Sequence, residues 1–245
     1  MDLMEQSAST LSRLIARREL SPVELMQAHL ARVAAANGAV NAVVSPRDPE
    51  VLLAEARAAE AELTKTGPQG WLHGIPMALK DLVAVKGLRS TYGSPLFADF
   101  VPAADDLVAA RLRAAGAIFT GKTNTPEWGH GSHSFNPVHG VTRNPYDLSR
   151  SAGGSSGGAA AAVACGLLHA VPVTLGHRHR CIRLSARATL REVAVPETVF
   201  GAVREAAVGG GHPVAGVHAL VACRGAQAFQ RRAASGVNAV DPIQP

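Results

Sequence analysis

Gly153-Gly-Ser-Ser-Gly-Gly158 runs without a break into the apolar stretch Ala159-Ala-Ala-Ala-Val-Ala164. Glycines let the backbone adopt positive φ and approach a ligand closely, and the first amides of a helix can hold an anion or a developing oxyanion. A flexible Gly/Ser linker has a similar composition, but a linker would not lead at once into an apolar helix over 159–168. The stretch therefore predicts a Gly/Ser loop that opens a helix packed into a core.

Around this loop, short apolar runs alternate with helical patterns from Trp71 onward. The patterns predict a strand over 75–79, a helix capped by Asp105 or Asp106, a strand over 117–120 and a long loop over about 122–156. Such alternation is typical of an α/β layer structure.

The first part of the chain, residues 1–66, has helical patterns. Ser21-Pro-Val-Glu24 combines an N-cap serine, a proline at the first helical position and a glutamate three residues after the cap. Asn37-Gly38 is a stop signal for that helix, and Asp48 is a cap for the next one.

The size and charge of the chain limit its partners. Residues 1–176 carry 15 Lys and Arg and 15 Asp and Glu, which leaves 9 of the 24 basic and 4 of the 19 acidic residues for 177–245. The nine basic residues of 177–245 are all arginines, and they are scattered through a segment whose only aromatic residues are Phe200 and Phe229. We therefore expect no nucleic-acid partner. No apolar stretch is long enough to cross a bilayer, and we expect no membrane partner. The sequence lacks a secretory pattern and a disulfide framework, which favours the cytoplasm.

Lys80 closes the apolar run Ile75-Pro-Met-Ala-Leu79 and is followed by Asp81. Burial among apolar groups lowers the pKa of a lysine and makes its neutral amine available as a base near pH 7. Strand ends also carry surface lysines that pair with a neighbouring carboxylate. The segment alone favours this second interpretation, with Asp81 as the partner.

Two further motifs match known binding patterns, one for nucleotides and one for metals, but their sequence context argues against both. Gly116-Ala-Ile-Phe-Thr-Gly121-Lys122-Thr123 matches the phosphate-loop pattern, but here a helix precedes the first glycine and a strand occupies the supposed loop, so we reject nucleotide binding. His177-Arg-His179-Arg-Cys181 would place three metal ligands on one face of a strand. No carboxylate lies near them, and we expect no metal.

Six stretches together resemble the amidase signature family, and the resemblance covers about two-thirds of the chain. They are Leu20-Ser-Pro-Val-Glu24, Asn41-Ala42, Gly74-Ile-Pro-Met-Ala-Leu-Lys-Asp81, Gly121-Lys-Thr-Asn-Thr-Pro-Glu127, Arg143-Asn-Pro-Tyr-Asp147 and Gly153-Gly-Ser-Ser-Gly-Gly158. Each is modest alone, but their order and spacing are specific. The resemblance implies a mixed α/β sheet sandwiched by helices, of which this chain has only a truncated part, with the Gly/Ser loop at its centre.

The resemblance also implies a Ser-Ser-Lys mechanism that hydrolyses a carboxylic amide without a metal or organic cofactor. Lys80 is then the base, and Ser155 is the bridging serine that relays a proton between the base and the nucleophile. Gly153, Gly154 and Ser156 belong to the substrate and oxyanion loop. The family nucleophile lies about two dozen residues further on.

We find no nucleophile at that place in the sequence. The chain has Leu175-Gly-His-Arg-His-Arg-Cys-Ile-Arg183 there, and Ser185 lacks a glycine-rich setting. With suitable codons, a shift of one base turns this stretch into Thr-Asp-Thr-Gly-Ala-Ser, which fits the missing segment. We therefore hypothesise that residues from about 169–177 onward are an out-of-frame translation and form an irregular tail.

These expectations divide the chain into an N-terminal helical segment over 1–66, a partial α/β core over 67–176 and a non-family tail over 177–245. They predict an amidase by ancestry that is inactive or nearly so. Three alternatives stay open: a short working amidase that uses Ser185 or Ser155 as nucleophile, a non-catalytic binding or scaffolding protein, and an amidotransferase A-subunit-like protein. The expected partner is a small-molecule amide, and a homo-oligomer stays open.

Overall fold

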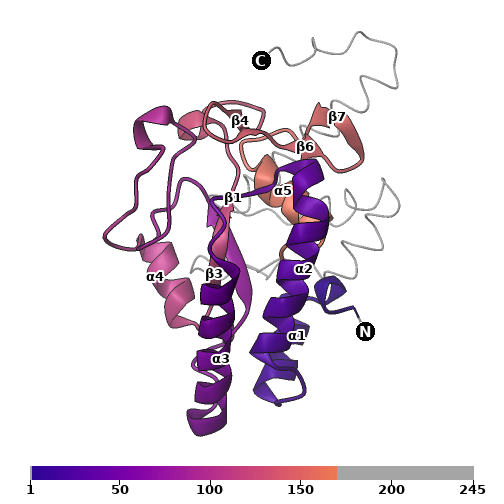
Figure 1. Cartoon of the computed structure of the whole chain (residues 1–245), viewed down its shortest axis with the longest axis vertical. Coiled ribbons are helices and arrows are strands. Elements are labelled where there is room, and N and C mark those ends of the chain that lie inside the picture. Colours follow the sequence, from indigo (N-terminus) through magenta and orange to yellow (C-terminus); the bar gives the residue numbers. More distant parts are fainter. Residues whose placement is uncertain (1, 170–245) are drawn as a thin grey trace, which may run out of the picture.

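The computed structural model describes residues 2–169 of the 245-residue chain (Figure 1). Several predictions fall on residues 170–245 and so lie outside the described residues. They are the irregular tail, the shifted frame, Ser185 as an alternative nucleophile, and the ligand pattern from His177 to Cys181.

The N-terminal part is helical, as predicted. It contains the 3-10 helix η1 (Leu3–Glu5), α1 (Ala8–Ala16), α2 (Pro22–Val40), the short strand β1 (Val43–Val44) and α3 (Pro49–Thr66). Ser21 forms the predicted capping box: its hydroxyl accepts from the N–H groups of Val23 and Glu24, and the Glu24 carboxylate accepts from the N–H of Ser21. Asp48 caps α3 through its side chain. Both helix starts were therefore readable from local sequence.

The end of α2 differs from the prediction. The helix continues through Asn37-Gly38 and ends at Val40, where Asn41 adopts a left-handed conformation with φ 51°. The Asn37 side chain accepts from the N–H groups of Ala42 and Val43 and donates to the carbonyl of Val43. A glycine inside a helix costs about 1 kcal/mol relative to alanine. Burial of Val40 and the three Asn37 bonds offset that cost, so Asn37 organises the turn after the helix.

The central sheet is mixed and has the order β1-β3-β2. β2 (Pro76–Lys80) runs parallel to β3 (Ile118–Thr123), and β1 pairs antiparallel with the other edge of β3. In the stretch that matches a phosphate loop, residues Ile118–Thr123 form strand β3, and α4 (Leu107–Ala114) precedes it. Because β1 comes from the first 66 residues, the N-terminal segment shares its sheet with the part that follows.

The start of α4 also differs in detail. Asp106 occupies the N-cap position but makes no capping hydrogen bond with its side chain. Its carboxylate instead accepts from the N–H of Ala84, and Asp105 pairs with Arg113 at 2.8 Å. These two carboxylates tie the loop after β2 to the helix.

Helices cover both faces of the sheet, as predicted. Neighbouring β3 residues point to opposite faces: Ile118 packs with Met26 and Leu52 from α2 and α3. Phe119 joins the larger cluster that includes Leu11 of α1 and Leu112 of α4. Figure 1 shows α2 with α5 (Gly157–Ala164) beside the strands and α4 on their other side.

The region between β3 and α5 is not the featureless loop that we predicted. It contains η3 (Glu127–Gly129) and two antiparallel pairs of strands, and η2 (Pro95–Phe97) precedes α4. The pairs are β4 (Phe135–Asn136) with β5 (Gly140–Val141), and β6 (Arg143–Asn144) with β7 (Asp147–Ser151). These strands are short and are joined by turns rich in Asn and Gly, so the sequence pattern indicated a loop.

Across residues 2–169, no helix is both long and apolar enough to span a bilayer.

Candidate active site

Lys80 is the last residue of β2 and lies beside the Gly/Ser loop at the start of α5. Its Nζ lies 2.9 Å from the Oγ of Ser155, a residue 75 positions away in the sequence. Lys80 is partly buried, and only 8% of Ser155 is exposed. The structure therefore brings together the two residues that the sequence offered as base and bridging serine. The interpretation of Lys80 as a surface lysine paired with Asp81 is wrong, because the Asp81 carboxylate binds Thr91 instead.

The environment of Lys80 lowers the pKa of its amine and so raises the fraction that is neutral near pH 7. Burial lowers its pKa from the ordinary value of 10.5 to about 8, because desolvation penalises the ammonium form. A neutral amine can accept the Ser155 proton, whereas an ammonium can only donate. A general base needs both a hydrogen bond to the group that it deprotonates and a suitably lowered pKa, and Lys80 has both features. Its role as the base stays a prediction.

The Gly/Ser loop leaves no room for side chains beyond its serines. A Cβ on Gly158 would lie 2.3 Å from the Asn124 nitrogen, and one on Gly154 would lie 3.0 Å from the His133 carbonyl carbon. Gly153 has φ 74°, which a side chain disfavours, and the Gly154–Ser155 peptide bond is cis. Glycine is thus required here for close backbone packing.

The backbone of Ser155 is held from the neighbouring loop. Its carbonyl accepts from the hydroxyls of Thr125 and Ser134, each at 3.3 Å. The Ser134 hydroxyl also accepts the Gly157 N–H at 2.8 Å. This amide of the first helical turn is therefore already satisfied, and it is not available to a developing oxyanion. The oxyanion role of Gly153, Gly154 and Ser156 stays a prediction.

A second lysine is buried on the other face of the sheet. Lys122 is 0% exposed, and burial lowers its pKa to about 8 although Asp81 and other carboxylates raise it. Its Nζ donates to the carbonyl of Val83. In the register of the sheet, Lys122 pairs with Leu79, whereas Lys80 pairs with Thr123, so the two lysines point to opposite faces.

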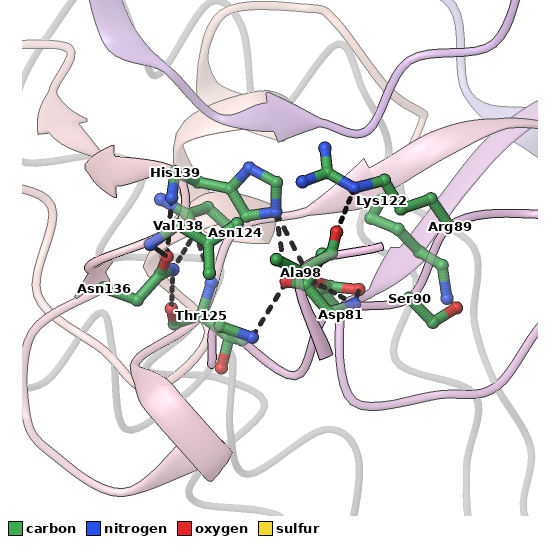
Figure 2. Close-up of polar contacts among 12 residues, drawn as sticks. Asp81, Arg89, Ser90, Ala98, Lys122, Asn124, Thr125, Asn136, Val138 and His139 are labelled. Atoms are coloured by element: carbon green, nitrogen blue, oxygen red, sulfur yellow. Dashed lines mark hydrogen bonds and ion pairs between the residues drawn. The ribbon is translucent and has the colours of Figure 1, made fainter. Parts of the chain in front are cut away.

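Sequence reasoning missed the buried polar groups behind the site. Asp81, Thr91 and Asn124 are each 0% exposed, and Asn136 is 3% exposed. Figure 2 shows Asp81, His139, Asn136, Asn124 and Thr125 linked by polar contacts. Asp81, Asn124 and Thr125 stand inside two of the stretches that carry the family resemblance. That placement was the only signal, because nothing local shows that a polar residue is buried.

A metal centre has no support in residues 2–169, where no group of three His, Cys, Asp or Glu side chains could hold an ion.

Comparisons with known proteins identify the family of this chain. The family model described as Amidase matches residues 24–176. The chain belongs to the amidase signature family. It is 44% identical over 163 residues to the A subunit of the glutamyl-tRNA(Gln) amidotransferase of Acidothermus cellulolyticus, a match that covers 66% of this chain and 32% of the relative. It is 44% identical over 167 residues to an acylamidase of Rhodococcus erythropolis, covering 66% of this chain and 34% of the relative.

Solved structures give the same result for the fold of this amidase-family chain. A fatty acid amide hydrolase superposes with a TM-score of 0.64 at 30% identity, covering 68% of this chain and 29% of that one. A peptide amidase from Stenotrophomonas maltophilia superposes with a TM-score of 0.60 at 34% identity, covering 66% and 34%. This chain spans about a third of the length of the curated relatives that it matches.

Proposed function

We propose that Lys80 and Ser155 form the proton-relay half of a centre that hydrolyses carboxylic amides. The observation that carries this proposal is the 2.9 Å contact between the Lys80 Nζ and the Ser155 Oγ. In the neutral state, Lys80 takes the Ser155 proton, and Ser155 in turn takes a proton from the nucleophile as it attacks the amide carbonyl. When the intermediate collapses, the C–N bond breaks, Ser155 donates its proton to the leaving nitrogen, and the Lys80 ammonium returns a proton to Ser155.

The nucleophile that completes such a centre would follow Ser155 by about two dozen residues, outside the described part of the chain. Residues 175–183 contain no serine. We therefore propose that this chain is inactive or nearly so, and that a shifted reading frame is the cause. Sequencing the coding DNA tests the cause: a shifted frame that does not continue as amidase-like sequence contradicts it.

The substrate class follows from the relatives only in outline. Their names include an acylamidase and a component of an amidotransferase, so a small-molecule amide and an amidotransferase A-subunit-like role are both consistent with the family. A non-catalytic binding or scaffolding role is the main alternative. A homo-oligomer stays open, and the cytoplasm stays the location that the cysteine usage favours.

The base role of Lys80 can be tested without turnover. The full chain is acetylated briefly at a series of pH values, and the Lys80 peptide is quantified by mass spectrometry, with exposed Lys65 on α3 as the internal standard. We expect the acetylation rate of the Lys80 amine to reach half its maximum near pH 8, in line with the lowered pKa. A midpoint near the ordinary 10.5 would overturn the proposal.

The predicted inactivity has its own test. The chain is treated with a fluorophosphonate probe of serine hydrolases, and labelled serines are mapped. We expect no single serine to react. Labelling at Ser155 or Ser185 that disappears in Lys80→Met would show instead that the chain is a short working amidase.

A further inference from the structure

The residue after Lys80 anchors a series of buried hydrogen bonds. The Asp81 carboxylate is 0% exposed and accepts from the Thr91 N–H at 3.0 Å and from the Thr91 hydroxyl at 2.5 Å. The Asp81 N–H continues the sheet ladder to the carbonyl of Thr123 at 3.0 Å. Side chains alternate along a strand, so Asp81 points away from the face on which Lys80 meets Ser155.

The direction of the hydrogen bond from the Thr91 hydroxyl to Asp81 determines the direction of the next hydrogen bond, between Thr91 and His139. Because this proton goes to Asp81, the oxygen can only accept from its other neighbours. These are the Gly93 N–H at 3.0 Å and His139 Nε2 at 3.1 Å. His139 therefore carries a hydrogen on Nε2, which lies 3.6 Å from the Asp81 carboxylate. The histidine side chain is 9% exposed, so this link is shielded from water.

The second half of the series runs from His139 back to the Gly/Ser loop. The backbone N–H of His139 donates to Asn136 Oδ1 at 2.7 Å, and Asn136 Nδ2 donates to the Thr125 carbonyl at 2.7 Å (Figure 2). The Thr125 hydroxyl then donates to the Ser155 carbonyl at 3.3 Å. We call this series the Asp81–Ser155 network; its members are Asp81, Thr91, His139, Asn136, Thr125 and Ser155.

The network joins two segments that nothing in the local sequence holds together. One end is covalently next to Lys80, and the other end is the backbone of Ser155. A shift of either segment would lengthen the 2.9 Å contact between Lys80 Nζ and Ser155 Oγ, and would first have to break buried hydrogen bonds, which is costly in a low-dielectric interior.

We propose that the Asp81–Ser155 network positions the Lys80 amine against the Ser155 hydroxyl, which makes Thr91, His139 and Asn136 positioning residues of the site. This inference rests on the function proposed above for the pair. The competing interpretation is that the network only stabilises the loops around the sheet. The two differ in what they predict for Lys80 itself, since only a positioning role couples the network to the environment of its amine.

The experiment uses matched variants at Thr91, which is fully buried. Thr91→Val keeps the shape and the overall charge but removes the hydroxyl, and Thr91→Ser keeps the hydroxyl. The readout is the pH midpoint of Lys80 acetylation in the full chain, with the urea midpoint measured in parallel. We expect Thr91→Val to raise the Lys80 midpoint from about 8 toward 10.5 and Thr91→Ser to restore it.

The size of the effect is measurable. A rise of about one unit in the Lys80 pKa lowers the neutral fraction at pH 8 from about a half to about a tenth, so acetylation at that pH slows about fivefold. The pair Thr125→Val and Thr125→Ser repeats the test at the Ser155 end and serves if Thr91→Val does not fold. A lower urea midpoint with an unchanged Lys80 midpoint in the valine variants would overturn the inference. A wild-type midpoint near 10.5 would instead overturn the proposed function.

Discussion

Two glycines in helices should respond in opposite ways to the same substitution. Gly158 lies in α5, directly after the Gly/Ser loop, and a Cβ there would meet three backbone atoms of Asn124 at 2.3, 2.5 and 2.8 Å. Gly38 lies in α2, and a Cβ there would meet nothing within 4 Å. Alanine improves helix propensity at both sites by up to about 1 kcal/mol, so only packing separates the two variants.

At Gly158 the packing term dominates. The clashing atoms belong to the backbone and cannot rotate away, so α5 or the end of β3 must move by about 1 Å to reach ordinary van der Waals separation. Overpacking of this kind costs about 1–3 kcal/mol or more. We expect Gly158→Ala to lower the free energy of unfolding by about 2 kcal/mol, and Gly38→Ala to raise it by about 0.5–1 kcal/mol.

Urea unfolding of the wild type and both variants measures these changes through the transition midpoint. The same movement would lengthen the 3.3 Å bond from Thr125 to the Ser155 carbonyl, so the Lys80 acetylation midpoint should rise in Gly158→Ala and stay fixed in Gly38→Ala. Equal stability of the two variants would refute the argument, because it would show that the close contact between α5 and Asn124 is absent.

Three other changes test separate parts of the structure. Ser21→Ala removes the capping box of α2 and should cost about 1 kcal/mol in urea unfolding, while Ser21→Asp should keep most of it. Asn37→Ala removes three side-chain bonds to the turn after α2 and should cost about 2 kcal/mol, more than Asn37→Asp, which keeps the acceptor. Burial lowers the pKa of Lys80 to about 8, so the folded state binds fewer protons than the unfolded state between about pH 8 and 10.5, and stability rises with pH there. Lys80→Met should therefore have a free energy of unfolding about 1 kcal/mol higher than the wild type at pH 7, after allowance for solvent screening. This difference should disappear by pH 10.5. A difference in the free energy of unfolding that stays constant at all pH values would show that Lys80 is not desolvated.

Features with a local physical cause could be predicted from the sequence. A capping serine, a proline at the first helical position and a glutamate three residues later are sufficient to start α2. The inverted context of Gly116–Thr123 was sufficient to reject a phosphate loop, and β3 confirms it. The short strands between Phe135 and Ser151 escaped prediction because each is stabilised by its partner strand and by contacts from distant residues, not by its own composition.

By itself, the sequence determined where the main helices start, where the two parallel strands lie and which family the chain belongs to. Only the tertiary structure decided the environment of each polar group. Lys80 and Lys122 are both lysines on strands of one sheet, yet the register turns the first toward Ser155 and the second toward the carbonyl of Val83. Asp81 is next to Lys80 in sequence but binds Thr91 on the other face. Desolvation and hydrogen-bond partners depend on atoms brought in from distant segments, and local sequence carries no record of them.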